Sequence, residues 1–474
     1  MRSPRRHAVV ELEPVFAAIR RRHEVQVEFS PEVRDAAAAA AARGAAAGAR
    51  ADRREVDLVS IDPAGSRDID QALALERRKG GYRFWYAIAD LAAWVESGDP
   101  VDLEARRRGT TVYCPDARAP LHPVELSEGA ASLLEGAERP AVLWRIDLDD
   151  RGAVADVAVE RALVRNRRAM SYVDAQHEID AGTATGALAL LREIGEARLA
   201  LERERGGVSL NLPEQNVVRV DGHYVLRYDA GLPVESWNAQ LSLCCGMAAA
   251  ELMLSAGVGV LRTLPKADAR SLDLLRQHSL ALGVAWPAGL SYPEWVRSLD
   301  VSTPAGAALT TQAARTLRGA SYVAFDGAPP ADHAHSAIAA PYAHVTAPIR
   351  RLVDRFANEC VLAAAAGIRP PGWALDALPS VAGWMDAAAR RSSAVDREVI
   401  DVTEAAVLAH RLGEEFPAVV TNSGRGSSTI QLAEPAVIAS VAVELAPGTT
   451  CRVRLDSVDI AVPRTQFSVV STAP

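Results

Sequence analysis

The chain has little cysteine, no excess of basic residues and no long apolar run. Its 474 residues include five cysteines, and no pair of them has the spacing of zinc ligands. Reduced thiols of this kind are typical of a cytoplasmic protein, and that is the location we expect. The net charge of −8 lacks the basic footprint of most nucleic-acid binders, although it leaves room for a local basic groove.

Membrane and export signals are also scarce. No apolar run follows Met1 to Arg6, so we expect no signal peptide. The most apolar stretch, residues 241–261, contains Glu251 together with two serines and three glycines. This composition predicts a buried core helix rather than a membrane span, and we expect no membrane partner.

One acidic stretch is present instead, with three aspartates within nine residues. Asp68 and Asp70 are two apart, so their side chains share a face of an extended backbone. Residues 63–65, Pro-Ala-Gly, indicate a turn that folds Asp62 toward them. Carboxylates that close repel, and a hard divalent cation such as Mg²⁺ would remove the repulsion. The pattern predicts a phosphate-handling metal site, with a solvated acidic turn as the alternative.

The composition divides the chain into three parts. Residues 1–55 are rich in alanine and arginine, and the alanine run has no apolar face, so we expect a helical spacer or a mobile segment. Strand-like alternation and amphipathic helices from 56 to 413 predict an α+β domain. Five short strands within 414–474, punctuated by glycine and proline, predict a small β-barrel.

Two arginine-rich stretches are candidates for phosphate binding. Residues 161–168 contain four arginines, including Arg167, and indicate either a phosphate-binding wall or a solvated strand edge. In the second stretch, Pro348 is placed in the first turn of a helix, where proline is tolerated. Arg350 and Arg351 are then expected near a helix start, where anion binding is favourable.

Three blocks of sequence occur in the order found in a known family. They are Ile61–Asp70, Tyr86–Leu133 and Tyr342–Arg351, and the third reads Y-A-H-V-T-A-P-I-R-R. Together they resemble the ribonuclease II (RNB) family of 3′→5′ exoribonucleases, whose motifs are D-x5-D-x-D-D and Y-x-H-F-T-S-P-I-R-R. The resemblance implies an RNB-type catalytic domain, with mixed sheets surrounded by helices, followed by an OB-like barrel.

The resemblance also implies roles for individual residues. The metal-binding positions are Asp62, Asp68, Asp70 and Gln71. The catalytic residues are Asp70 and Arg350. The RNA-binding candidates are Tyr113, Tyr172, Glu235, Arg167, Arg351 and Asp396. The implied cofactor is Mg²⁺, or Mn²⁺ in its place, and two such ions about 4 Å apart would activate water and stabilise charge.

The implied reaction is hydrolysis of single-stranded RNA from its 3′ end to nucleoside 5′-monophosphates, by a monomer with no inferred protein partner. Gln71 departs from the family, because a neutral amide replaces an aspartate and would hold a second metal more weakly. One alternative is therefore an RNA-binding protein that has lost hydrolysis. Another is a metal-dependent hydrolase that acts on a different phosphate substrate.

Further departures concern how the chain grips RNA. Leu210 stands where a clamping phenylalanine is common, and the barrel has no obvious aromatic platform. The stretch before Asp62 is too short for the family's two cold-shock barrels. We therefore expect RNA to be held mainly by the catalytic channel, with strong salt dependence.

Overall fold

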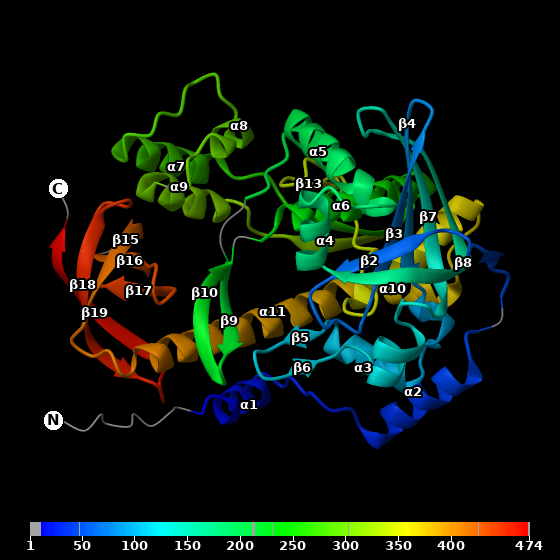
Figure 1. Cartoon of the computed structure of the whole chain (residues 1–474), viewed down its shortest axis with the longest axis horizontal. Coiled ribbons are helices and arrows are strands. Elements are labelled where there is room, and N and C mark those ends of the chain that lie inside the picture. Colours follow the sequence, from blue (N-terminus) through cyan, green and yellow to red (C-terminus); the bar gives the residue numbers. More distant parts are fainter. Residues whose placement is uncertain are drawn as a thin grey trace.

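The structure, a computed structural model, describes residues 11–46, 48–210, 214–229, 231–301, 303–424 and 426–472. A sheet covered by helices lies at one end of the molecule and a small β-barrel lies at the other (Figure 1). The long helix α11 (Gly372–Leu408) runs from the sheet to the barrel (Figure 1). This arrangement confirms the predicted α+β fold with a C-terminal OB-like barrel.

The central sheet has six strands in the order β1-β8-β2-β3-β4-β7, and β8 pairs in addition with β7. The strands are β1 (Ala51–Asp52), β2 (Leu58–Asp62), β3 (Gln71–Arg78), β4 (Gly81–Ala89), β7 (Glu138–Asp149) and β8 (Val154–Ser171). Lys79 and Gly80 form the tight β3–β4 turn, and Gly80 and the following Gly81 both have positive φ, which glycine adopts without strain. Strand β2 runs parallel to β8, with Asp62 opposite Ser171. The acidic stretch therefore starts at the end of a central strand.

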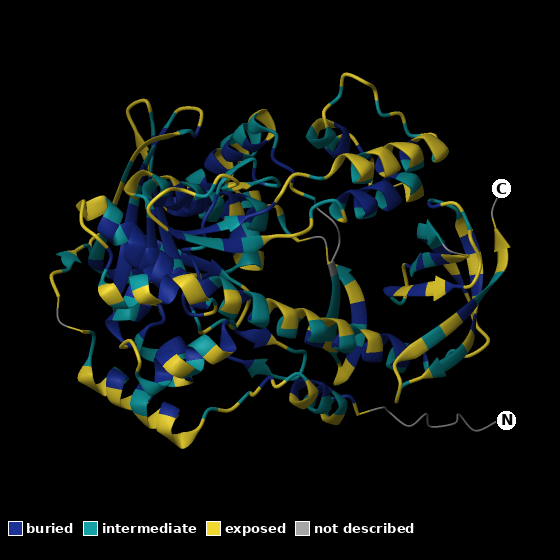
Figure 2. Cartoon of the chain, turned by 180° about the vertical axis from the view of Figure 1, so that it is seen from behind, coloured by how far each residue is buried: buried dark blue, intermediate teal, exposed yellow. Residues whose placement is uncertain are grey.

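Helices pack on one face of this sheet. They are α4 (Tyr172–Asp180), α5 (Ala187–Arg205), α6 (Pro233–Ala256), α10 (Leu352–Ala366) and α11. The largest core cluster joins sheet residues such as Phe84 and Trp144 to Leu191 of α5 and Leu241 of α6. Buried residues accordingly concentrate at the sheet in Figure 2. Helix α6 is long and apolar enough to cross a membrane by length and composition, but half of that stretch is buried, as a core helix requires.

The N-terminal helices α1 (Glu13–Arg22) and α2 (Pro31–Arg43) correct the prediction of a faceless spacer. Val33, Ala37 and Ala40 of α2 are buried in a second core cluster, with Leu58 of the sheet. Their spacing of four and three residues places them on one side of the helix. The apolar face was therefore present, but it is made of small alanine side chains that allow close approach rather than of large ones.

The barrel is closed and contains five strands in the order β15-β16-β17-β19-β18. They are β15 (Glu415–Gly424), β16 (Ser427–Leu432), β17 (Val437–Val441), β18 (Thr450–Asp459) and β19 (Arg464–Thr472). Alternate side chains point inward, and Phe416, Ile430 and Phe467 are among those buried there. The short helical segments elsewhere are η1 (Leu91–Ala93), α3 (Pro100–Arg108), η2 (Leu126–Ala130), α7 (Ala269–Ala281), α8 (Tyr292–Arg297) and α9 (Pro304–Ala314).

The remaining strands form two-stranded pairs. They are β5 (Val112–Tyr113) with β6 (Arg118–Ala119), β9 (Glu214–Val220) with β10 (His223–Asp229), β11 (Val258–Thr263) with β12 (Ser321–Asp326), and β13 (Ala334–His335) with β14 (Ala340–Pro341). The β5–β6 hairpin matters for function, because it borders the acidic stretch.

Candidate active site

The acidic stretch begins with the turn that its sequence predicts. The Ser66 N–H donates to the Pro63 carbonyl at 3.1 Å, directly after β2 ends at Asp62. Gly65 has φ +81°, a left-handed conformation that side chains disfavour. The turn reverses the chain, so Asp62 and the two later aspartates line the same cavity.

One buried serine holds the extended part of this stretch. The Ile69 N–H donates to Ser132 Oγ at 2.9 Å, and the same hydroxyl donates to the Arg67 carbonyl at 2.7 Å. The hydroxyl therefore serves as both donor and acceptor. These two bonds fix the backbone on either side of Asp68 and immediately before Asp70.

Asp70 is the most deeply held carboxylate of the site. Its Oδ1 accepts from the Ile349 N–H at 2.6 Å, and its Oδ2 lies 3.4 Å from Arg350 Nε. Burial raises the pKa of Asp70 to about 8 against the opposing charge of Arg350. Pro348 to Arg350 form a turn before α10, which begins at Leu352, so the prediction of Pro348 in the first helical turn is wrong. The turn nevertheless aims a backbone N–H and a guanidinium at Asp70.

Asp62 and Asp68 have contrasting surroundings. The Oδ2 of Asp62 is buried and has no hydrogen-bond partner among the described residues. Burial raises the pKa of Asp62 to about 6. Asp68, in contrast, forms an ion pair with Arg118, in which its Oδ1 lies 2.7 Å from Arg118 Nη1. An orphaned buried carboxylate oxygen is a chemically suitable ligand for a hard divalent cation.

Arg118 and Glu128 also belong to this site, and the sequence analysis missed both. Arg118 lies opposite Tyr113 in the β5–β6 hairpin and pairs with Glu128 of η2. Glu128 also lies 3.4 Å from Arg67. Residues 115–116, Pro-Asp, are a turn signal that would have placed Arg118 beside Tyr113. No comparable local signal leads to Glu128.

These side chains surround a cavity of about 450 Å³. Its charged lining consists of Asp62, Asp68, Asp70, Glu128, Arg67, Arg118 and Arg350. Tyr113 stands at the cavity with 52% of its surface exposed, as a stacking platform requires. Four carboxylates and three guanidiniums in one cavity suit a substrate that carries phosphate, provided that a cation offsets the acids.

The oxygen donors of the cavity limit how a metal ion could be held. In the part of the chain that the structure describes, no group of three or more His, Cys, Asp or Glu side chains is arranged to hold a metal. Mg²⁺ commonly uses one or two carboxylates, with water and substrate phosphate completing its shell. Asp70, which is buried, and Asp62, which is half-buried with one buried oxygen lacking a partner, line the same cavity and suit a single ion of that kind.

Three of the predicted site residues have other partners. Gln71 Oε1 accepts from the Tyr86 hydroxyl at 2.7 Å. Arg351 forms two contacts with Asp354, at 2.8 and 2.9 Å. Arg167 Nη2 donates to the backbone carbonyl of Arg54, two residues after β1, at 2.6 Å. The structure therefore does not bring Gln71, Arg351 or Arg167 to the lining of the cavity.

The other RNA-binding candidates lie outside the cavity lining as well. Tyr172 opens α4 directly after Ser171, the partner of Asp62 in β8, and its hydroxyl lies 3.4 Å from Asn238 Nδ2. Glu235 Oε1 accepts from the N–H of residue 232 and caps α6. Asp396 is exposed on α11. Of these three, Tyr172 is connected to the acidic stretch by strand pairing, because its chain neighbour Ser171 lies opposite Asp62.

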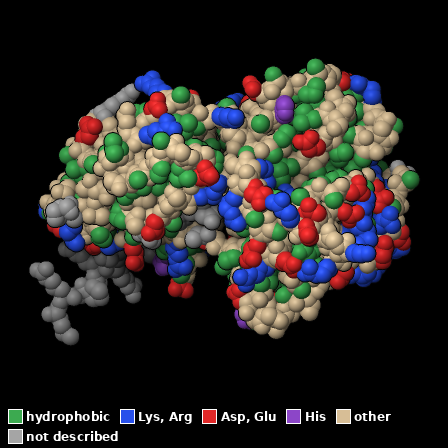
Figure 3. Space-filling view, turned by 90° about the horizontal axis from the view of Figure 1, so that it is seen from above, with side chains coloured by type: hydrophobic (Ala, Val, Ile, Leu, Met, Phe, Trp, Pro, Cys, Tyr) green, Lys and Arg blue, Asp and Glu red, His purple; other side chains and the backbone are tan. Residues whose placement is uncertain are grey.

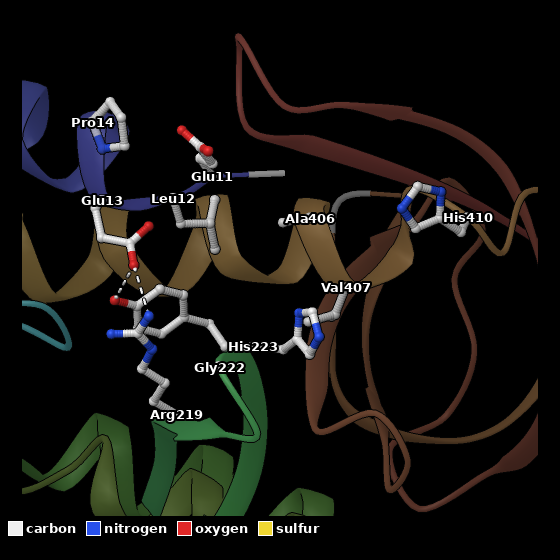
Figure 4. Close-up of a pocket in the computed structure, with 11 residues that line it drawn as sticks. Glu11, Leu12, Glu13, Pro14, Arg219, Gly222, His223, Ala406, Val407 and His410 are labelled. Atoms are coloured by element: carbon white, nitrogen blue, oxygen red, sulfur yellow. Dashed lines mark hydrogen bonds and ion pairs between the residues drawn. The ribbon is translucent and has the colours of Figure 1, made fainter. Parts of the chain in front are cut away.

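A second cavity, of about 680 Å³, lies between the start of α1, the β9–β10 hairpin and the end of α11 (Figure 4). Its Glu13 is already engaged, with the Tyr224 hydroxyl at 3.1 Å and Arg219 at 3.6 Å. None of the predicted site residues lines it.

On the face seen in Figure 3, acidic and basic side chains are interspersed rather than gathered by sign. That face offers no broad basic field for a polyanion.

Comparisons with known proteins give the family and the fold of this chain. A family model described as RNB domain matches residues 50–366, and one described as RNase II-type exonuclease C-terminal S1 domain matches residues 414–470. Ribonuclease R of Escherichia coli is 28% identical over 327 residues, which are 64% of this chain and 39% of that protein. The chain thus spans well under half the length of that relative.

Solved structures share the fold. Mycoplasma genitalium RNase R, in complex with ribose methylated single-stranded RNA, has a TM-score of 0.86 and 16% identity, covering 96% of this chain and 78% of that one. Yeast Ssd1, described as a pseudonuclease, has a TM-score of 0.73 and 14% identity, covering 95% and 59%. The fold is therefore found in proteins described as nucleases and in one described as a pseudonuclease.

Proposed function

Because the chain belongs to the RNB domain family, we propose that it is a ribonuclease II-type exoribonuclease acting on single-stranded RNA. The proposed reaction proceeds from the 3′ end and releases nucleoside 5′-monophosphates, as the family resemblance implies. One observation carries the proposal. Asp70 and Arg350, 280 positions apart, meet in an acidic cavity beside the exposed ring of Tyr113.

Each side chain of the cavity has a physical role in this proposal. Arg350 offers a planar guanidinium to the scissile phosphate, which suits two parallel hydrogen bonds. Asp70, which the Ile349 N–H fixes in place, would act in its ionised form as a ligand of the cation. Tyr113 stacks on a base regardless of its identity. A divalent cation bound by Asp62 and Asp70 would supply Lewis-acid stabilisation of the phosphate.

Mg²⁺ is the proposed cofactor, with Mn²⁺ as a substitute, and the cytoplasm is the proposed location. All five cysteines are free thiols, which supports a reducing compartment. The donor set of oxygen ligands supports a hard cation over a soft one. No protein partner is proposed, and the working unit is taken to be a monomer.

The direct test is release of labelled mononucleotides from a single-stranded RNA in the presence of Mg²⁺. We expect Asp70→Asn to abolish release while RNA affinity changes by less than about twofold, because the amide keeps the shape and removes the carboxylate that would hold the cation. Asp57→Asn, at an exposed carboxylate just before β2, is the control and should retain activity. Loss of RNA affinity in Asp70→Asn would make the residue structural and refute its proposed role.

A second candidate function is RNA binding without efficient hydrolysis. It is favoured by Gln71, which replaces an acidic ligand of the family motif and directs its amide oxygen to Tyr86. The relationship in fold to yeast Ssd1 is consistent with this reading. Tight RNA binding with no product over hours, under conditions in which Gln71→Asp does cut, would support this candidate against the enzyme.

Substrate choice provides a further check. A glutamate that contacts a 2′-hydroxyl would let the site distinguish RNA from DNA. The carboxylate of Glu235 caps α6, so any such contact has to be shared with that cap. Equal turnover of RNA and DNA oligomers would remove the proposed role of Glu235 and favour a hydrolase of another phosphate substrate.

A further inference from the structure

Two arginines of the acidic cavity have very different surroundings. Arg350 lies 3.4 Å from Asp70, and 47% of its side chain is exposed. Arg118 is instead held between two carboxylates, with Nη1 at 2.7 Å from Asp68 and Nη2 on Glu128. Only 24% of the Arg118 side chain is exposed. Arg350 is thus available to a substrate, whereas Arg118 is already a fixed charge of the site.

We propose that Arg118 takes the place of a second metal ion. In this view the cavity binds one divalent cation, at Asp62 and Asp70, and the Arg118 guanidinium supplies the second positive charge from the protein itself. Arg118 is a positioning residue, because it holds Asp68 in place and adds a positive charge to the cavity without contacting the substrate. The inference rests on the proposed function, since it concerns how the same cavity handles phosphate.

The ligands that a second ion would need are committed elsewhere. Gln71 carries no charge, and its amide oxygen accepts from the Tyr86 hydroxyl. Asp68 has its Oδ1 on Arg118. A cation that approached Asp68 would have to displace the Arg118 guanidinium or lie next to it. Two positive charges that share one carboxylate are close enough to repel strongly. The second position is therefore closed to metal unless Arg118 moves.

The position of Arg118 is fixed by more than its contact with Asp68. It lies in the β5–β6 hairpin opposite Tyr113, and its second carboxylate, Glu128, comes from the separate element η2. The turn of the hairpin is tied to α1 through Asp116 and Arg20, with Oδ2 and Nη2 2.8 Å apart. Since two elements hold Arg118, its charge stays in place whether or not a cation is bound nearby.

The charge of the cavity agrees with one ion. Four carboxylates and three arginines line it. With every group ionised, a single divalent cation changes the net charge from −1 to +1, which attracts a phosphodiester. A second divalent cation would leave a strong excess of positive charge in a small cavity and would hinder release of the nucleotide product.

The test counts Mn²⁺ ions bound to the full chain by isothermal titration calorimetry, with no RNA present. We expect one Mn²⁺ for the wild type. In Arg118→Gln, the freed Asp68 and Glu128 should admit a second Mn²⁺, with affinity at least about tenfold above any second binding in the wild type. Arg118→Lys, which keeps the positive charge, should again bind one ion.

A matched control is Arg145→Gln. Arg145 is likewise held between two carboxylates, Asp147 and Asp156, and 26% of its side chain is exposed, but it lies in β7 outside the cavity. This variant should bind one Mn²⁺, as the wild type does. A second ion in the control would show that loss of any paired arginine creates a site, which would overturn the inference.

Aspartate variants test the inference without relying on the folding of Arg118→Gln. Asp62→Asn should weaken the single Mn²⁺ by about tenfold or more, and Asp68→Asn should change it by less than about twofold. Two ions of similar affinity in the wild type would overturn the inference. So would equal weakening by Asp62→Asn and Asp68→Asn, or a folded Arg118→Gln variant that still binds one ion.

The counting experiment separates this inference from the proposed function. A chain that binds one Mn²⁺ and gains a second in Arg118→Gln, yet releases no mononucleotide from RNA, keeps the role of Arg118 and loses the exoribonuclease assignment. A wild-type chain that degrades RNA and binds two ions keeps the exoribonuclease assignment and loses the role of Arg118.

Discussion

The arginines of β8 and the arginine of the turn before α10 come from the two arginine-rich stretches of the sequence but have different neighbours. Arg161 pairs with Asp90, at 3.1 Å, and with Glu359. Arg168 pairs with Glu178. Arg350 instead has Asp70 at 3.4 Å and leaves nearly half of its side chain open to the cavity.

The difference favours one of the two interpretations that the sequence left open for β8. Arg168 and Arg350 have similar exposure, with 46% and 47% of their side chains open to solvent, so exposure does not distinguish the two stretches. Their surroundings do, because Arg161 and Arg168 lie in ion pairs along a strand, whereas Arg350 lines the acidic cavity. Basic composition alone did not distinguish them, because availability depends on neighbours far away in sequence.

The largest expected effect comes from removing the available arginine. Arg350→Ala should lower kcat by about 100- to 1,000-fold, the range for losing one preorganised donor to a developing negative charge. Arg168→Ala, which removes a paired arginine, should change kcat by less than about threefold. Rates of mononucleotide release measure both. Similar losses in the two variants would erase the distinction between the stretches.

Stability should show the opposite order. Asp90 and Glu359 are buried, so Arg161→Met leaves Glu359 without its arginine and Asp90 with only Arg50, at 3.5 Å, and should lower the free energy of unfolding by about 3 kcal/mol. Arg350→Met should lower it by less than about 1 kcal/mol, because its buried partner Asp70, whose pKa is raised to about 8, takes up a proton rather than staying charged. Urea denaturation at neutral pH gives both values. A larger loss in Arg350→Met would make that residue structural.

The acids that face these arginines should titrate differently. Burial raises the pKa of Asp62 to about 6 and that of Asp70 to about 8, whereas the bond to Arg165 lowers the pKa of Glu138. From about pH 4 to about pH 8 the folded cavity holds protons that the unfolded chain has released. Its contribution to the free energy of unfolding therefore falls as pH rises through that window.

Glu138 acts in the other direction. Because its pKa is lowered, its contribution to the free energy of unfolding is present at neutral pH and is lost as the solution becomes acidic.

Urea denaturation between about pH 5 and pH 8 with a chelator measures the contribution of Asp70. The free energy of unfolding should decline less steeply with pH for Asp70→Asn than for the wild type. Adding Mg²⁺ should stabilise the wild type more at pH 8 than at pH 6, since only the ionised carboxylates bind it. Parallel pH profiles for the two proteins would contradict the raised pKa of Asp70.

The smallest effect is expected at Arg167. Its guanidinium donates to a backbone carbonyl away from the cavity, so Arg167→Ala should leave RNA affinity within about twofold and the salt dependence of binding unchanged. Removing one phosphate contact would instead reduce the magnitude of the log–log salt slope by about 0.7 on a single strand. Fluorescence anisotropy at several salt concentrations measures the slope, and a decrease would return β8 to the RNA-binding surface.

Local sequence was sufficient for several parts of the molecule. The turn at Gly65, the β3–β4 hairpin at Gly80-Gly81 and the barrel strands follow from residue types that act within a few positions. The α+β class and the family also follow from the sequence, because three ordered blocks survive in it. In each of these cases, neighbouring residues restrict φ and ψ or alternate in polarity, and no distant partner is needed.

Tertiary structure decided how the site is assembled. The N–H of Ile349 on Asp70, the clamp of Arg118 by Asp68 and Glu128, and the contact of Gln71 with Tyr86 all join segments that the sequence alone does not place together. The apolar face of α2 is recognised only from its packing, in which it contacts α3 and η2. Burial and pairing set which charges remain available, and both depend on the packing of the whole chain rather than on spacing along it.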